Sequence, residues 1–368
     1  MPVPLLDFSA QHRAIREEVM AAIGGLVDSG GFILGQAVRD FEQRLAAYCG
    51  AAHALGCSSG TDALILPLMA MGIGPGDEVI VPSFTFFATA GCVRRVGATP
   101  VFVDIEAATF NLCPAAAEAA ITAKTRAIIP VHLFGQCADM DALMAIARKH
   151  RLHVIEDAAQ AIGARYGDRQ AGTIGDVGAL SFYPTKNLGA FGDAGACLTD
   201  NPRLDEAMRF LRVHGQTDEY RHQYVGGNFR IDAIQAVVLD IKLRFLDAAA
   251  EARRAAAQCY DQLLANIPGV VTPATAAGRL HVFNQYTVRA ERRDQLCAHL
   301  RSQGIGHRVY YPLPLHLQPC FADLGGQPGQ LPESEAAARE VVSLPMFPDL
   351  TDFQQQQVAE AVRSFYDG

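Results

Sequence analysis

Short apolar runs alternate with stretches of helical spacing through the first half of the chain. Glu78–Pro82, Thr99–Val103 and His153–Glu156 are nearly continuous in apolar residues, as in strands that are buried on both faces. Between the runs lie amphipathic patterns such as Met140–His150. This alternation predicts an α/β fold with a mainly parallel sheet and helices on both faces. The same sheet is expected to include Ala52–Leu55, Ala127–Val131, Gly178–Phe182 and Gly195–Thr199.

The pattern changes in the second half of the chain. One long helical pattern covers roughly Asp232–Ala265, a length that suits a helix connecting two domains. After Pro268 the segments become short: we expect a strand over Asn284–Val288, a helix over Arg293–Gln303 and a closing amphipathic helix from Asp352. This mixture predicts a smaller unit of α+β character at the C-terminal end.

The length of the chain supports this division. A chain of 368 residues exceeds what one small core organises and suits a large domain with a smaller one. We therefore predict a large α/β domain over residues 1–249 and a small C-terminal α+β domain over residues 250–368.

Composition and charge exclude several classes of protein. Half of the residues are apolar and 19% are charged, as in soluble globular enzymes. The net charge is −8 and no basic run stands out, so we expect no nucleic-acid partner. The apolar stretch near Ala63–Ile73 is broken by Pro67 and too short to span a bilayer, so no membrane partner is expected either.

The cysteines and the N-terminal segment indicate the cellular compartment in which the protein is expected. Nine cysteines are scattered singly and show no metal-ligand spacing, which favours reduced thiols and no metal site. The first residues lack the basic and apolar segments of a secretion signal. We expect a cytoplasmic protein.

Two residues at the ends of apolar strands carry the main chemical signal. Lys186 follows the strand of Ser181 and Phe182, and a lysine there can form a Schiff base with an aldehyde cofactor. Asp157 ends the apolar run Val154–Ile155 and could keep a pyridine nitrogen protonated, which makes the ring an electron sink. Alone, Asp157 could cap a following helix and Lys186 could simply be solvated. Together they predict an enzyme that uses pyridoxal phosphate.

A phosphate cradle is expected between a strand and a helix that begins near Asp62. Gly60 lets the backbone approach an anion closely, the N–H groups of the helix start favour negative charge, and Thr61 adds a hydroxyl. A tight turn with a helix cap is the alternative for this segment alone. Ser181, on the strand before Lys186, can bind the same phosphate or be a satisfied core hydroxyl.

Two further side chains suit a planar cofactor. Phe86 follows the strand that ends at Pro82 and could stack on the ring, although a phenylalanine there is often part of the core. Gln160, three residues after Asp157, could reach a ring hydroxyl. Glu156 should point to the other face of the strand, so we interpret it as structural.

Candidates for substrate contact are less sharply marked. Tyr183 shares a strand face with Ser181, and Tyr310, Tyr311 and His316 lie in a region rich in prolines, where aromatic side chains often serve packing alone. Asn228 lies in a glycine-rich segment ahead of the long helical pattern, which by itself indicates only a turn.

Taken together, these motifs resemble the DegT/DnrJ/EryC1/StrS family of nucleotide-sugar aminotransferases nearly end to end. The matching segments are Ser29–Gly35, Ser59–Leu64, Gly72–Ile80, Pro82–Phe86, Glu156–Gln160, Lys186–Asn187 and Asn228–Gln235. The resemblance implies the type I, aspartate-aminotransferase-like fold and the cofactor pyridoxal 5'-phosphate.

The resemblance also implies a role for individual residues. Lys186 matches the Schiff-base lysine, and Asp157 the partner of the pyridine nitrogen. The other matched residues are the phosphate ligands Gly60, Thr61 and Ser181, the stacking Phe86, and Gln160 beside the ring hydroxyl. Asn228 matches a residue that reaches the phosphate of the other subunit, so a homodimer with shared active sites is implied.

The implied reaction moves an amino group from L-glutamate to a nucleotide-linked keto-sugar and releases 2-oxoglutarate. Gly226-Gly227-Asn228, where many members have Gly-Tyr-Asn, and Tyr310-Tyr311-Pro312 are more similar to members that aminate C3 than C4. The amino sugar would serve a surface polysaccharide or a glycosylated metabolite. Amination of a keto-inositol cyclitol and a non-catalytic regulatory protein are the alternatives; Lys186 argues against the sugar dehydratases that carry histidine there.

Overall fold

Seven strands form the central sheet of the protein, which the computed structural model describes over residues 2–367. Their order is β1-β9-β8-β5-β4-β2-β3, and all neighbouring pairs are parallel except that β9 is antiparallel to both β8 and β1. The predicted mainly parallel sheet is confirmed. Its strands are β1 (His53–Cys57), β2 (Glu78–Pro82), β3 (Thr99–Val103), β4 (Thr125–Ile128), β5 (His153–Asp157), β8 (Val177–Ser181) and β9 (Gly195–Thr199).

Helices cover both faces of this sheet, because successive side chains of each buried strand point to opposite sides. In β5, Val154 joins a core cluster with α6, whereas its neighbour Ile155 joins a cluster with α3 and α4. The helices of this part are α1 (Ser9–Ser29), α2 (Gln36–Cys49), α3 (Gly60–Ala70), α4 (Ala88–Arg95), α5 (Pro114–Ala119), α6 (Met140–His150) and α7 (Pro202–Arg212).

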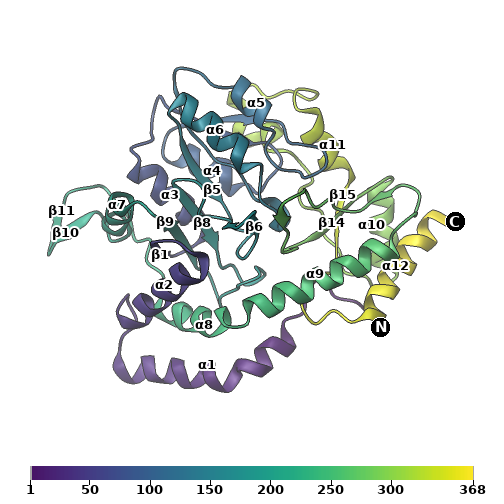
Figure 1. The fold of residues 1–368 in the computed structure, drawn as a ribbon, viewed down its shortest axis with the longest axis horizontal. Coiled ribbons are helices and arrows are strands. Elements are labelled where there is room, and N and C mark those ends of the chain that lie inside the picture. The colour runs from purple at the N-terminus through teal and green to yellow at the C-terminus, as the bar shows by residue number, and fades with distance from the viewer. Residues whose placement is uncertain (1, 368) are drawn as a thin grey trace.

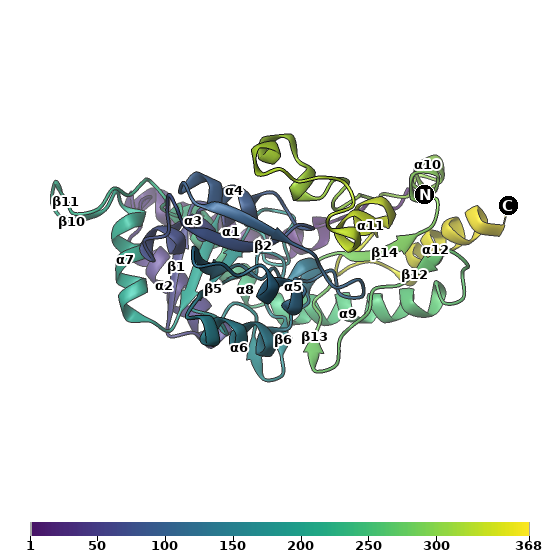
Figure 2. The same cartoon turned by 90° about the horizontal axis from the view of Figure 1, so that it is seen from above.

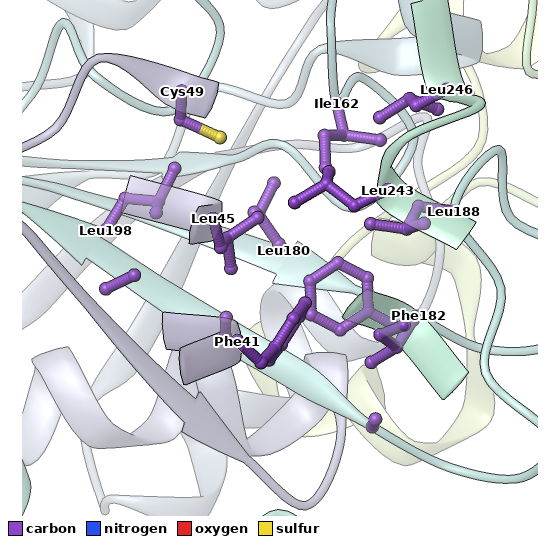
Figure 3. Packing of buried hydrophobic residues seen from close by; sticks show 14 of the residues in the cluster. Phe41, Leu45, Cys49, Ile162, Leu180, Phe182, Leu188, Leu198, Leu243 and Leu246 are labelled. Atoms are coloured by element: carbon purple, nitrogen blue, oxygen red, sulfur yellow. The ribbon is translucent and has the colours of Figure 1, made fainter. Parts of the chain in front are cut away.

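The core beneath α2 shows how one helix is held on the sheet. Phe41 and Leu45 from α2 are fully buried, and the Phe41 ring meets the Phe182 ring edge-on at 5.7 Å between centroids. Leu180 and Leu198, from β8 and β9, belong to the same core cluster, which Figure 3 shows. Truncating a leucine buried in this way costs about 2–5 kcal/mol. This packing holds β8, the strand that leads to Lys186, firmly in place.

The single long helix predicted over Asp232–Ala265 is wrong: the chain forms two helices there. α8 (Ala233–Leu243) packs against α1 and α2, while α9 (Leu246–Leu263) packs against α12 (Asp352–Asp367). In Figure 1, α9 extends from α8 toward the C-terminal part of the molecule. The helices bury against different partners, so the chain turns between them. Arg244 and Phe245 are ordinary helix formers, so local propensity carried no stop signal.

A second, three-stranded antiparallel sheet, in the order β12-β14-β15, organises the C-terminal part. Its elements are β12 (Val270–Val271), β14 (Tyr286–Ala290), β15 (Val341–Leu344), α10 (Arg293–Ser302) and α11 (Pro332–Glu340), with 3₁₀ turns at Leu315–Leu317 and Pro319–Leu324. The start of the chain joins this part, since Val3 pairs with Ile305. The division into residues 1–249 and 250–368 stays a prediction.

Two small features lie outside these layers. β6 (Arg165–Tyr166), β7 (Arg169–Gln170) and β13 (Arg279–Leu280) form a short sheet, and a 3₁₀ turn covers Leu133–Gly135. The hairpin of β10 (Gln216–Asp218) and β11 (Arg221–His222) projects from one end of the molecule, as Figures 1 and 2 both show. None of the helices within residues 2–367 combines the length and apolar character needed to cross a membrane.

Candidate active site

The carboxyl ends of the parallel strands open onto a pocket of about 550 Å³. The segments after β2, β5 and β8 form its walls together with the start of α3 and residues from the C-terminal part. Residues predicted from separate motifs therefore meet in one place. The predicted residues that line this pocket are Gly60, Thr61, Phe86, Asp157, Gln160, Ser181, Tyr183, Lys186, Tyr310 and Tyr311.

The start of α3 lies directly against the end of β8. Ser59 is the helix cap, and its Oγ accepts from the backbone N–H of Asp62 at 3.1 Å. A Cβ added to Gly60 would lie 2.5 Å from Ser181 Cβ, so only glycine allows this approach. The N–H groups of a first helical turn have no partners within the helix and favour an anion. The predicted helix cap is thus present, on Ser59, while the phosphate cradle at Gly60 and Thr61 stays a prediction.

Asp157 brings a buried carboxylate to the pocket. Its Oδ2 accepts from the Thr89 hydroxyl at 2.8 Å and its Oδ1 from the Ala159 N–H at 3.2 Å. Burial raises the pKa of Asp157, against the lowering effect of these bonds and of Lys186. Turns rather than a helix follow β5, so helix capping does not explain this residue. A buried carboxylate with spare lone pairs suits a cationic N–H donor.

Glu156 lies on the opposite side of β5, as predicted. Its carboxylate accepts from the backbone N–H groups of Gly172, Ile174 and Gly175 and pairs with His132 Nε2 at 2.7 Å. Burial alone would raise the pKa of Glu156, but the His132 pair and the backbone bonds bring it below its ordinary value. The pKa values of these two adjacent acids are therefore shifted in opposite directions, and only Asp157 lines the pocket.

Lys186 lines the same pocket as Asp157. Burial lowers the pKa of Lys186 to about 8, while the nearby Asp157 carboxylate acts in the raising direction. Its loop is tight: the Lys186 N–H donates to Tyr183 O at 2.8 Å, and Gly189 packs against Pro184. A lysine that loses its proton near neutral pH is suited to act as a nucleophile or base.

The amide of Gln160 is oriented by two bonds. Its Oε1 accepts from the Phe134 N–H at 2.7 Å, and its Nε2 donates to the Tyr311 hydroxyl at 3.1 Å. The second N–H of the amide is free to reach an acceptor on a bound ligand. Burial raises the pKa of Tyr311, so this phenol stays protonated at neutral pH.

Two aromatic side chains are exposed in the pocket. Phe86 is 55% exposed, with its ring 6.1 Å from that of Tyr311, and Tyr183 is 53% exposed. A planar ligand bound in the pocket would cover both rings. The pocket therefore brings together the start of a helix, an aromatic face, a carboxylate and an amine. This set fits the polar and planar groups of pyridoxal phosphate.

The structure does not bring Asn228 and His316 into this pocket. Asn228 lies in a neighbouring hollow of about 620 Å³, whose lining shares Ser59 and Asp193 with the pocket. His316 is buried, with its Nδ1 2.7 Å from the Ser83 hydroxyl and its Nε2 3.4 Å from Glu335. These bonds hold the segment after the tyrosine pair onto the end of β2.

Sequence reasoning missed several residues at this site. Thr89 donates to Asp157 from 68 residues away, and His132 pairs with Glu156 from 24 residues away. No local sequence pattern indicates contacts between residues so far apart. Arg308 and Gln285 line the pocket as well. The sequence could have indicated Arg308 as a pocket residue, since it is a charged residue two positions before the predicted Tyr310.

Comparison with known sequences gives matches over nearly the whole chain. The profile of the DegT/DnrJ/EryC1/StrS aminotransferase family matches residues 13–363. A protein of Geobacillus stearothermophilus named pleiotropic regulatory protein is 53% identical, over 100% of this chain and 99% of its own. The dTDP-3-amino-3,4,6-trideoxy-alpha-D-glucose transaminase of Streptomyces venezuelae is 48% identical, over 99% and 96%. The UDP-N-acetyl-3-dehydro-alpha-D-glucosamine 3-aminotransferase of Acidithiobacillus ferrooxidans is 45% identical, over 100% and 98%.

Solved structures give the same result. DesV of S. venezuelae superposes with a TM-score of 0.97 at 47% identity, covering 100% of this chain and 99% of DesV. NtdA of Bacillus subtilis, solved with its cofactor PMP bound, superposes with a TM-score of 0.89 at 32% identity, covering 96% and 82%. The arrangement of sheets and helices is shared with both.

Proposed function

The chain belongs to the DegT/DnrJ/EryC1/StrS aminotransferase family, and we propose that it transfers the amino group of L-glutamate to a nucleotide-linked keto-sugar. Its fold is the type I fold of pyridoxal-phosphate enzymes, a mixed seven-stranded sheet with a small C-terminal sheet. It is a PLP-dependent aminotransferase of the sugar class. The predictions of family, fold, cofactor and enzyme class are confirmed.

One observation carries the proposal at the level of the site. Lys186 and Asp157 line the same pocket, and burial shifts both pKa values toward the uncharged forms. A bound pyridine ring whose nitrogen is protonated would favour the charged form of Asp157 by pairing with it, while Lys186 would react as a neutral amine. Burying an aspartate and a lysine costs stability, so packing alone does not explain why both residues are placed here.

The surrounding residues suit the remaining parts of the cofactor. The N–H groups of Gly60 and Thr61 and the hydroxyl of Ser181 would hold the phosphate, and Phe86 would cover the ring. When bound, pyridoxal phosphate supplies an electron sink for the carbon that carries the amine. Lys186 Nζ would then take up and return the proton that moves during transamination.

Amination at C3 of the sugar is favoured over C4. Support comes from the two relatives named for 3-amino products, one acting on a dTDP-sugar and one on a UDP-sugar. The Gly226-Gly227-Asn228 segment adds to this support. The resulting amino sugar would enter a surface polysaccharide or a glycosylated metabolite. The nine free cysteines suit the cytoplasm, where nucleotide sugars would be the substrates.

Assembly as a homodimer with shared active sites is part of the proposal. Asn228 is exposed and lies beside its own pocket rather than in it, which suits a role in the pocket of a second subunit. Apolar side chains near this hollow are also unusually open: Phe32 is 42% and Ile33 59% exposed. Contact with a partner subunit would cover them.

A regulatory role is the second candidate, because a relative with 53% identity is named a pleiotropic regulatory protein. A regulator without turnover would bind the cofactor but leave it unchanged when L-glutamate is added. A cyclitol aminotransferase would react with L-glutamate and with a keto-inositol rather than a nucleotide sugar.

One set of experiments distinguishes the sugar aminotransferase from the regulator and the cyclitol aminotransferase. The purified holoenzyme should lose its visible cofactor absorbance on addition of L-glutamate, and it should regain it with a 3-keto member of a panel of dTDP-, UDP- and GDP-keto-sugars. Borohydride reduction should fix the cofactor on the peptide that contains Lys186. Absence of any response to amino donors would support the regulator, and response only to keto-inositols would support the cyclitol enzyme.

A further inference from the structure

Arg308 places a guanidinium in the pocket that also contains Lys186. Its side chain is exposed and lines the pocket together with Tyr310. Its backbone is held on the edge of β15, where the Arg308 N–H donates to Ser343 O at 3.1 Å and the Ser343 N–H donates to Arg308 O at 2.8 Å. Both Arg308 and Tyr310 contribute to the lining of the pocket.

The guanidinium of Arg308 has no carboxylate partner among residues 2–367. Arg289, on the neighbouring strand β14, shows the contrast: it pairs with Glu340 at 2.8 Å. An arginine presents a rigid fork of N–H donors that matches a carboxylate or phosphate. An unpaired arginine held by a sheet edge at a pocket is therefore prepared for an anionic ligand.

The position of Arg308 decides between the anions that a sugar aminotransferase meets. The cradle proposed for the cofactor phosphate consists of Gly60, Thr61 and Ser181, which line the pocket. The neighbour Tyr310 also borders a small cavity of about 20 Å³ with Thr185, the residue before Lys186. Arg308 and the reacting amine of Lys186 line the same pocket. An amino acid has its carboxylate one bond from the carbon that reacts, whereas the diphosphate of a nucleotide sugar lies beyond the sugar ring.

We propose that Arg308 binds a carboxylate of the amino donor and so serves the amino-acid half of the reaction, not the sugar half. This inference rests on the proposed aminotransferase function. The pocket must accept an amino acid and a nucleotide sugar in turn at one reacting centre. A flexible, exposed arginine on the wall can pair with the carboxylate of the first substrate and turn toward solvent for the second.

The test uses holoenzyme of the wild type, Arg308→Gln, Arg308→Lys and Arg301→Gln. Arg301 is an exposed arginine of α10 outside the pocket lining and serves as the matched control. The reaction with L-glutamate is followed by the cofactor absorbance in a single turnover. Binding of glutarate, a dicarboxylate that cannot react, and of dTDP and UDP is measured by calorimetry. Circular dichroism and thermal melting verify that each variant is folded.

Arg308→Gln should raise the L-glutamate concentration for half-maximal rate, and the Kd of glutarate, by about 10- to 100-fold, the loss expected for charge-assisted hydrogen bonds. The limiting single-turnover rate should change much less, Arg308→Lys should be intermediate, and Arg301→Gln should match the wild type. Affinity for dTDP and UDP should stay within about twofold, because the nucleotide is not the partner of Arg308.

Two results would overturn the proposal: unchanged binding of glutarate and L-glutamate in Arg308→Gln, or a loss of dTDP or UDP affinity in their place. The proposed function fails separately. If the wild type reacts with another L-amino acid but not with L-glutamate, the donor is wrong, and weaker binding of that amino acid in Arg308→Gln still supports the carboxylate site.

Discussion

Gly60 and Ser181 approach so closely that a methyl group on Gly60 would lie 2.5 Å from Ser181 Cβ and 2.8 Å from its Oγ. This contact joins the first turn of α3 to the end of β8. It therefore sets the distance between helix-start N–H groups and a hydroxyl that would bind one phosphate together. The two residues come from motifs far apart in sequence.

Replacing Gly60 by alanine should lower the affinity for pyridoxal phosphate. The added methyl group must push α3 away from β8, and overpacking of this kind costs about 1–3 kcal/mol of stability. Moving α3 relieves part of this cost but separates the groups that would bind the phosphate. The Kd of the cofactor, measured on apoenzyme by fluorescence titration, tests this. Gly74→Ala is the matched control, because a Cβ there would meet only Val96 O, at 3.5 Å. Equal affinity in both variants would remove the close contact from cofactor binding.

The attachment of cofactor to apoenzyme should follow the titration of Lys186. Its pKa is lowered to about 8 from an ordinary value of 10.5, and only the neutral amine attacks a carbonyl. The rate should therefore rise with pH around a midpoint near 8, rather than near 10.5. Stopped-flow absorbance with pyridoxal phosphate at several pH values measures this midpoint. Asp157→Asn should shift it downward, because the Asp157 carboxylate favours the charged lysine.

Asp157→Asn should slow transamination by several orders of magnitude with only a modest loss of cofactor affinity. The amide cannot hold a pyridine nitrogen protonated, so the bound ring would lose its capacity as an electron sink. Single-turnover rates with L-glutamate provide the measurement. Asp193→Asn, which alters another carboxylate of the same lining, is the control. A near-normal rate in Asp157→Asn would exclude the electronic role.

Glu156→Gln should destabilise the protein and change its pH dependence. The pKa of Glu156 lies below its ordinary value of 4.5, so the folded state holds the charge more strongly than the unfolded state. Its contribution is fully present above the unfolded pKa and is lost as pH falls through the folded pKa. Breaking such a buried pair costs about 3–5 kcal/mol.

Urea unfolding of wild type and Glu156→Gln at neutral and acidic pH measures this difference. We expect the gap in unfolding free energy to be widest at neutral pH and to shrink below the ordinary pKa of 4.5. Val154→Ala, in the same strand, changes packing without a charge and should show a gap independent of pH. A constant gap for Glu156→Gln would contradict the charge-based explanation.

Mixing two inactive variants should restore activity if subunits share their sites. Lys186→Ala lacks the reactive amine, and Asn228→Ala lacks the side chain proposed for the partner's phosphate. In a hybrid dimer one site would keep both residues, so activity should return after the two proteins are unfolded together and refolded. Full activity of Asn228→Ala alone, or a fully active monomer at micromolar concentration, would refute the shared site.

Much of the fold followed from local patterns along the chain. Glu78–Pro82, Thr99–Val103 and Gly195–Thr199 are strands over the predicted residues, and Met140–His150 is a helix over its predicted bounds. The first and third of these strands are almost wholly buried, Thr99–Val103 is rich in apolar residues, and the helix is amphipathic, so period and composition reveal them. The break between α8 and α9 was not predictable in this way, since it results from packing against different parts of the molecule.

The sequence by itself determined which residues are candidates for the chemistry. Lys186, Asp157 and Gly60 stand at strand ends or a helix start, and the topology of a parallel sheet brings such positions to one edge. What only the tertiary structure decided is their environment. The burial that shifts the pKa values of Lys186 and Asp157 is produced by side chains distant in sequence. The same holds for Arg308, whose lack of an ion-pair partner within residues 2–367 becomes visible only when the chain is folded, because a pocket is a property of surfaces that meet in space.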